Sequence, residues 1–150
     1  MTLPEIHLIG ISLEQKTTNQ NNQSTRDIGE LWQKFVDENV LYRVTDRLSN
    51  DIYAVYYDFE GDHARRFSYF VGAKVEPATL PPKGLQSLKI PVQKYQKFLA
   101  KGKMPMCIGE TWREIWKSGI KRAFGFDFEV LDERSHNWQN AELDIFVSVP

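Results

Sequence analysis

Apolar residues recur at helical spacing in two stretches of the chain. Positions 28, 31, 32, 35 and 36 hold Ile, Leu, Trp, Phe and Val, and positions 108, 111, 112, 115 and 116 hold Ile, Thr, Trp, Ile and Trp. Spacing of i, i+3, i+4, i+7 and i+8 is typical of an amphipathic helix that packs one face on a core. The pattern therefore predicts two main helices, the first of them capped by Ser24 or Thr25.

Runs of β-branched and aromatic residues alternate with polar or Pro-rich breaks, which is typical of strands. The predicted strands cover residues 5–13, 52–59, 68–76, 126–132 and 142–149, with extended segments over 88–100. Residues 15–25 contain no apolar side chain and predict a mobile polar loop, and residues 60–63 predict a turn. Strands outnumber helices and hairpins connect most of them, so we expect an α+β fold with a curved, largely antiparallel sheet.

The two predicted helices also look like copies of each other. IGELWQKF, from Ile28, and IGETWREI, from Ile108, share four identical residues at an offset of 80 positions (108 − 28). Internal repeats of this kind indicate how a domain is built. Each half has the order strand, helix, strand, strand, so we predict one domain over 1–150, with one half over about 1–78 and the other over about 83–150. The seam between such halves is a common place for a ligand pocket.

Composition and charge narrow the class of protein. The chain is 41% hydrophobic and carries a net charge of −1 without a basic stripe, so we expect no direct DNA binding. Cys107 is the only cysteine, and we find neither a signal peptide nor a membrane-length apolar run, which predicts a cytoplasmic protein. His7, His63 and His136 lack the spacing of metal ligands, and no Gly-rich phosphate loop exists, so we expect neither a metal nor a cofactor.

Glu129 lies inside a predicted strand, flanked by the apolar residues Phe128 and Val130. In FDFEVLD, alternation places Asp127, Glu129 and Leu131 on one face. An offset of 74 positions (129 − 55) aligns this strand with IYAVYYD and matches Glu129 with Val55. A buried carboxylate is unfavourable without a partner. From the residues alone, Glu129 is therefore an exposed edge residue, a partner of Lys117 or Arg122, or an acid that binds a ligand.

Together these segments resemble the GyrI-like effector-binding domain that follows the DNA-binding parts of AraC-type and MerR-type multidrug-responsive activators. The matching segments are IGELW, IYAVYYDFEGD, YFVGAKV, GLQSLKIPVQKY, WREIW, DFEVLDER and AELDIFVSV. The chain is most similar to the stand-alone integron-associated effector-binding proteins. The resemblance implies a pseudo-twofold fold of the SHS2 type, with duplicated strand-helix-strand-strand halves, two main helices and a pocket near the seam.

The resemblance implies that the pocket binds small amphipathic molecules, often cationic aromatic drugs, with Glu129 as the acid at its base. Trp112 and Trp116 are candidates for one wall, since ring faces attract a cation. Tyr53 and Tyr57 share a strand face and are candidates for the opposite wall. The first interpretation is thus a stand-alone, non-enzymatic small-molecule-binding domain related to transcription regulation.

Two alternatives stay open, so the sequence does not decide whether the protein is an enzyme. In one, a hydrolase of reactive small molecules uses Glu129 as general base and Tyr53 or Tyr57 as acid. In the other, the protein shields a target enzyme, as in the gyrase-inhibitor branch of the family. The regulators carry a helix-turn-helix module before this domain, whereas the first predicted strand here begins at about Glu5. We expect no membrane contact, and a homodimer or a regulatory protein partner remains open.

Overall fold

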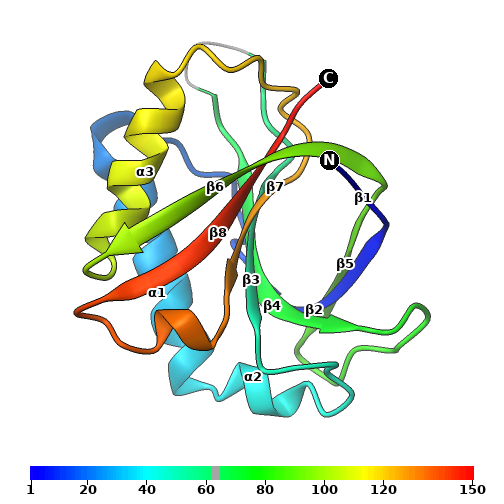
Figure 1. Cartoon of the computed structure of the whole chain (residues 1–150). Coiled ribbons are helices and arrows are strands. Elements are labelled where there is room, and N and C mark those ends of the chain that lie inside the picture. The colour runs from blue at the N-terminus through cyan, green and yellow to red at the C-terminus, as the bar shows by residue number, and fades with distance from the viewer. Residues whose placement is uncertain (62–64) are drawn as a thin grey trace.

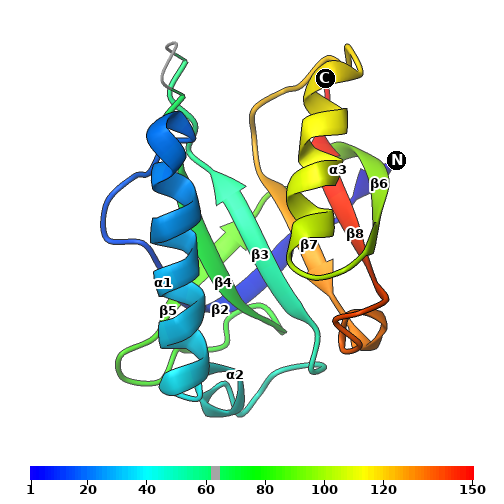
Figure 2. The ribbon, with the colours of Figure 1, turned by 90° about the vertical axis from the view of Figure 1, so that its left-hand side faces the viewer.

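The computed structural model describes residues 1–61 and 65–150 and shows a curled sheet with its two main helices on one face (Figures 1 and 2). The strands are β1 (Thr2–Leu3), β2 (Ile6–Ser12), β3 (Ile52–Tyr57), β4 (Ser68–Val75), β5 (Gln86–Ile90), β6 (Gln93–Gly102), β7 (Asp127–Leu131) and β8 (Ala141–Ser148). The helices are α1 (Gln23–Asp37), α2 (Val40–Arg43) and α3 (Met106–Lys117), with 3-10 turns at Gln20–Asn22 and Glu133–Ser135. The α+β class is confirmed.

The strand order is symmetric about the centre of the sheet. It runs β1-β6-β8-β7-β3-β4-β2-β5, and neighbouring strands pair antiparallel. The β3-β4-β2 unit lies beneath α1, and the β7-β8-β6 unit lies beneath α3 (Figure 2). The central β3–β7 pair sets Ala54 opposite Glu129. The two units therefore meet along β3 and β7, between the two helices.

The outer strands cross between the two units. β5 pairs with β2 at one edge of the sheet, although it follows the Pro-rich segment that marks the predicted boundary. β1 pairs with β6 at the other edge. Each predicted half thus supplies an edge strand next to the strands of the other, which joins the two units in one continuous sheet.

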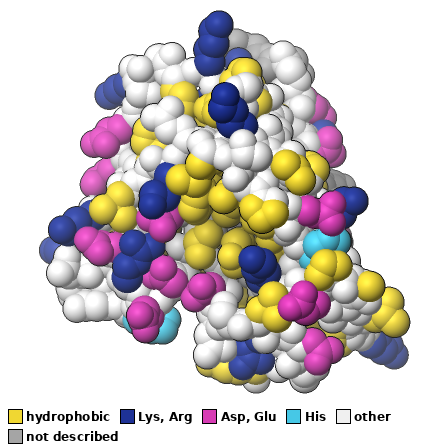
Figure 3. Space-filling view, turned by 45° about the vertical axis from the view of Figure 1, so that its right-hand side comes forward, with side chains coloured by type: hydrophobic (Ala, Val, Ile, Leu, Met, Phe, Trp, Pro, Cys, Tyr) yellow, Lys and Arg dark blue, Asp and Glu magenta, His cyan; other side chains and the backbone are white. Residues whose placement is uncertain are grey.

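Buried side chains form three clusters. One lies between α1 and the sheet, around Leu31, Phe35 and Tyr69. A second lies between α3 and the sheet, around Trp112 and Ile115. The third fills the opposite, inward-curled face and contains Val55, Phe70, Tyr95 and Phe128. Figure 3, seen from the side turned away from the helices, shows hydrophobic side chains gathered in a hollow.

Three local predictions need correction. The helix α1 begins one residue before Ser24, after Asn22 in the left-handed conformation, and no side chain caps it. Ser24 is instead buried, and its Oγ donates to Asn19 Oδ1 at 2.7 Å. The polar segment before α1 is also anchored, because Thr17 is fully buried and pairs with Phe67. The elements β1 and α2 were not predicted, since they are too short to show a hydrophobic period. The predicted turn at 60–63 lies partly outside the described residues.

Candidate functional site

A cavity of about 1280 Å³ opens between α1 and α3, above the central strands of the sheet. Its lining is rich in aromatic residues from both units, among them Trp32, Tyr56, Tyr69, Trp112, Trp116 and Trp138. Trp116 and Trp138 are 52% and 58% exposed, so they lie at the mouth of the cavity. The two predicted tryptophans of α3, Trp112 and Trp116, thus both contact this space.

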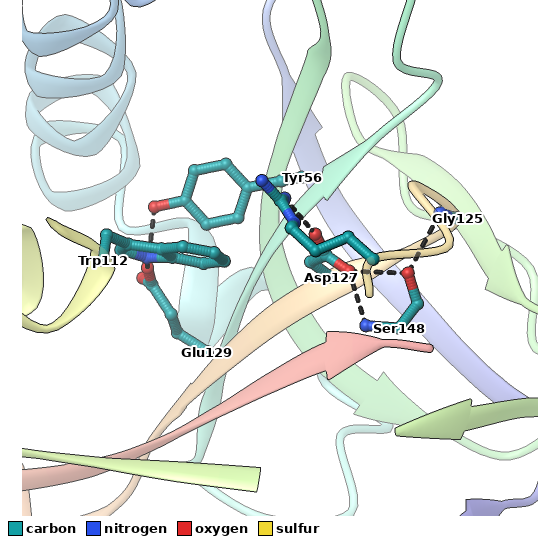
Figure 4. A network of polar contacts seen from close by, with 7 residues as sticks. Tyr56, Trp112, Gly125, Asp127, Glu129 and Ser148 are labelled. Carbon is teal, nitrogen blue, oxygen red and sulfur yellow. Dashed lines mark hydrogen bonds and ion pairs between the residues drawn. The ribbon is translucent and has the colours of Figure 1, made fainter. Parts of the chain in front are cut away.

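Glu129 lies at the base of the cavity on β7 and is only 2% exposed. Its Oε2 accepts a hydrogen bond from Tyr56 Oη at 2.7 Å and another from Trp112 Nε1 at 2.8 Å (Figure 4). Within residues 1–61 and 65–150, no hydrogen bond reaches the other oxygen, Oε1, and no basic side chain pairs with the carboxylate. Glu129 is therefore neither exposed at an edge strand nor paired with Lys117 or Arg122, the two alternatives that the sequence left open.

Burial is the main influence on the ionisation of this carboxyl group. It raises the pKa of Glu129 above its ordinary value, and the hydrogen bonds from Trp112 and Tyr56 offset part of the rise. Burial also raises the pKa of Tyr56 well above its usual range, and the neighbouring negative charge adds to the effect. Tyr56 therefore stays protonated, and its hydroxyl donates a hydrogen bond to Glu129. The result is a buried carboxyl group that accepts from two neutral donors and has no cationic partner among residues 1–61 and 65–150.

Tyr53 and Tyr57 do not line the cavity, which corrects their prediction as its second wall. They lie on the opposite face of β3, where Tyr53 contacts Phe128 at 5.9 Å between ring centroids and Tyr57 stacks on Phe126 at 5.4 Å. Adjacent side chains of a strand point to opposite faces. An error of one residue in aligning β3 with β7 therefore exchanged the two faces, and it is Tyr56 that contacts Glu129.

The matching of Val55 with Glu129 fails for the same reason. Val55 is fully buried on the face away from the helices, and Ala54 is the residue directly opposite Glu129. The orientation of Tyr56 follows from the pairing of β3 with β7, which the sequence does not contain. The helix-facing residues of β7 are Asp127, Glu129 and Leu131, which have odd numbers. The helix-facing residues of β3 are 52, 54 and 56, which have even numbers. An even offset such as 74 therefore matches a helix-facing residue of β7 with a residue on the other face of β3.

The first unit carries a related hydrogen bond in the same cavity. Trp32 Nε1 donates to Tyr69 Oη at 2.8 Å, just as Trp112 Nε1 donates to Glu129. The Tyr56 ring contacts both sides, with its centroid 5.0 Å from that of Tyr69 and 5.2 Å from that of Trp112. Sequence reasoning assigned Trp32 to the core and did not identify Tyr69, because a tyrosine in an apolar strand carries no distinguishing pattern.

A second charged cluster includes Arg122, which lines the cavity, but its charges are neutralised within the protein. Arg122 Nη2 contacts Asp127 Oδ2 at 2.7 Å, and the fully buried Asp127 also accepts hydrogen bonds from the backbone nitrogen and Oγ of Ser148, each at 2.7 Å (Figure 4). The Arg122 guanidinium lies 4.4 Å from the Phe124 ring centroid and 5.6 Å from that of Trp112. Arg122 is thus held by Asp127 and does not neutralise Glu129.

Other kinds of site find no support in the described part of the chain. No group of three or more His, Cys, Asp or Glu side chains there is arranged to hold a metal ion. No helix there is long and apolar enough to cross a membrane. The single thiol, Cys107, lies in the first turn of α3 and is buried, and its sulfur contacts that of Met104 at 3.7 Å.

Comparison with known proteins places this geometry in a family. A family model described as integron-associated effector binding protein, Cass2, matches residues 1–149. The Bacillus subtilis (strain 168) protein YobU, named as a candidate transcriptional regulator, is 27% identical over 143 residues, which cover 91% of this chain and 89% of YobU.

Two solved structures show the same fold over the whole chain. The Vibrio cholerae integron cassette protein VCH_CASS2 has a TM-score of 0.72 at 25% identity, and the match covers 100% of this chain and 94% of that one. SAV2435, solved with tetraphenylphosphonium bound, has a TM-score of 0.77 at 16% identity, with 100% and 92% covered. The identification of the chain as an effector-binding domain is confirmed by the family match.

Proposed function

This chain belongs to the family of integron-associated effector-binding proteins, and we propose that it binds small amphipathic cations with aromatic bodies in the cavity between α1 and α3. The proposal rests on one observation. The carboxyl group of Glu129 is buried and lines the cavity, and it has no cationic partner in the described chain. A buried charge is unfavourable unless it is paired. A ligand cation would provide the pairing that the protein itself withholds.

The surrounding rings support a cation of this class. The faces of Trp and Tyr rings attract positive charge, more strongly where water is excluded. Tyr56 and Trp112 lie edge to face at 66° and both donate to Glu129, so their orientation is fixed before any ligand arrives. Pre-arranged walls reduce the entropy lost on binding. That SAV2435, a relative by fold, binds tetraphenylphosphonium supports the same ligand class here.

A hydrolase is the second candidate, because Glu129 and Tyr56 form a contact typical of an acid–base pair. The raised pKa of Tyr56 argues against it, since a proton held so firmly is a poor one to donate in a reaction near neutral pH. We therefore rank binding first. Incubation with a cationic aromatic compound, followed by mass spectrometry of the solution, separates the two functions. Recovery of the unchanged compound supports binding, and a stoichiometric excess of product supports catalysis.

The direct test of the proposal is a titration with tetraphenylphosphonium, followed by quenching of tryptophan fluorescence. Trp32, Trp112 and Trp116 line the cavity, so occupancy should change their emission. Saturable quenching with a one-to-one stoichiometry is expected. Quenching that stays linear in the ligand concentration, or that persists when the cavity is blocked by a Gly109→Trp substitution on α3, would count against a site in this cavity.

Binding of such a cation should depend on pH. Burial raises the pKa of Glu129, and a bound cation favours the ionised carboxylate. The affinity should therefore be highest above the Glu129 pKa of the free protein and fall as the pH decreases through that value. Because a quaternary phosphonium does not titrate, the change reports the protein. Dissociation constants measured from about pH 4 to pH 8 check this, and a constant value across that range would contradict it.

Tyr56→Phe should move this pH dependence upward. The substitution removes a hydrogen bond that lowers the pKa of Glu129, so the carboxyl group should hold its proton to a higher pH. The midpoint of the binding curve against pH is the measurement. Tyr57→Phe is the matched control, because Tyr57 is the next residue on the same strand but packs on Phe126, away from the cavity. Equal shifts in the two variants would show that Tyr56 does not act through Glu129.

A further inference from the structure

The two related indole hydrogen bonds in the cavity end on different acceptors. Trp112 donates to a carboxylate, Glu129, whereas Trp32 donates to a phenol, Tyr69, and both contacts are 2.8 Å. A carboxylate only accepts hydrogen bonds. A phenol that accepts one hydrogen bond still carries a proton of its own to donate. The two polar points of the cavity are therefore chemically distinct.

The Tyr69 proton has no acceptor within the described chain. The single hydrogen bond at its hydroxyl is the one received from Trp32. Tyr69 is 1% exposed, and it belongs to the lining of the cavity. An unpaired donor in a buried position is unfavourable, on a scale that makes such groups rare in folded proteins. A donor in this state, in the wall of a ligand cavity, is available to a ligand.

The Tyr69 hydroxyl also stays protonated under ordinary conditions. Burial raises its pKa well above the usual range, and the negative charge of Glu129 adds to the rise. It therefore acts as a neutral donor and does not become a second anion. The hydrogen bond from Trp32 fixes the position of the oxygen, and the Tyr56 ring, 5.0 Å away between centroids, supports one side of the Tyr69 ring.

We propose that Tyr69 is a second polar anchor of the cavity and donates a hydrogen bond to a neutral oxygen acceptor, a carbonyl or an ether, on the ligand. This rests on the proposed function and narrows its ligand class. The preferred ligand carries its cation toward Glu129 and its oxygen toward Tyr69, with the aromatic body against the Tyr56 ring that contacts both sides. Glu129 then supplies attraction to charge, and Tyr69 supplies selection among cations of similar size.

The experiment compares two probes that differ only in the acceptor. One is tetraphenylphosphonium with a para-acetyl group on one ring, and the other carries a para-isopropenyl group, which has the same shape and no oxygen. The parent protein should bind the acetyl probe more tightly by about three- to tenfold, the range for one neutral hydrogen bond. In Tyr69→Phe the ratio of the two dissociation constants should fall to about one, because no donor remains for the acetyl oxygen.

Two further variants isolate the donor from its surroundings. Trp32→Phe removes the bond to the Tyr69 oxygen but leaves the hydroxyl proton, so it should retain the preference for the acetyl probe even if both affinities change. Glu129→Gln should weaken both probes alike and leave their ratio intact. Trp32 is only partly buried, so water can satisfy its indole in Tyr69→Phe, and circular dichroism would verify that this variant folds.

The outcomes distinguish the proposed role of Tyr69 from the proposed binding of cations in the cavity. An unchanged ratio in Tyr69→Phe, or a ratio of one in the parent protein, would overturn the role of Tyr69 while leaving cation binding in place. If neither probe binds to the parent protein, the proposed function itself is wrong. A preference that disappears in Trp32→Phe but persists in Tyr69→Phe would assign the selection to the indole instead.

Discussion

Glu129→Gln is expected to weaken the binding of tetraphenylphosphonium by about 1–3 kcal/mol, the scale of a hydrogen bond or contact to a charged group. The substitution removes the charge and keeps the shape. The Gln oxygen can still accept from Tyr56 and Trp112, so the two rings should keep their places. Dissociation constants from tryptophan quenching, measured well above the Glu129 pKa, give the change directly. Equal affinities in the parent and the variant would show that the carboxylate does not hold the ligand cation.

A neutral compound and a stability measurement serve as controls for this variant. Triphenylphosphine oxide, which has similar rings without a net charge, should lose much less affinity than the phosphonium. The folded-state pKa of Glu129 lies above its unfolded value, so the folded protein binds the proton more tightly. Stability attributable to this group is therefore greatest at low pH and is lost as the pH rises through the raised pKa. At neutral pH Glu129→Gln should be at least as stable as the parent, and a marked loss of stability would point to a structural role.

Asp127→Ala is expected to lower the free energy of unfolding by about 3–5 kcal/mol, the range for removing one partner of a buried ion pair. Asp127 is fully buried, and its loss would leave the Arg122 guanidinium, whose side chain is 15% exposed, without its 2.7 Å counter-charge. It would also remove the acceptor of the Ser148 backbone nitrogen, which Oδ1 satisfies at 2.7 Å. Urea unfolding followed by circular dichroism measures the change.

Asp144→Ala is the matched control for Asp127→Ala. Asp144 Oδ2 pairs with Arg134 Nη2 at 2.9 Å, but the Arg134 side chain is 38% exposed, so solvent screens the interaction. This variant should lose only about 0–1 kcal/mol, as surface ion pairs do. A small loss in both variants would mean that water or rearranged side chains satisfy Arg122 after Asp127 is removed. Asp127→Asn removes the charge but keeps an oxygen that can accept from Ser148. A large loss of unfolding free energy in this variant too would show that the charge stabilises the fold, and not only the hydrogen bonds to Ser148.

Much of the fold could be predicted from periodicity. The stripes around Trp32 and Trp112 placed both helices, and alternation with β-branched residues placed the longer strands to within a few residues. These patterns are local, because each residue's face follows from its neighbours a few positions away. The short β1 and α2 escaped, and the edge pairings of β1 with β6 and β5 with β2 join segments far apart in the chain. No local period encodes such pairings.

For the candidate site, too, the sequence determined some features and the tertiary structure determined others. By itself the sequence determined the kind of chemistry, a glutamate flanked by apolar residues in a strand and tryptophans on helix stripes, and the interruption at Glu129 was visible without any structure. The tertiary structure decided which tyrosine meets that carboxylate, because strand register is set by pairing across the sheet and a shift of one residue exchanges the two faces. In the folded chain Tyr56 contacts Glu129, whereas Tyr53 and Tyr57 lie on the other face of the sheet. Arg122 pairs with Asp127. Within the part of the chain that the structure describes, the fold also leaves Glu129 without a cationic partner. This condition depends on every side chain packed around Glu129 and so cannot be read from any one segment.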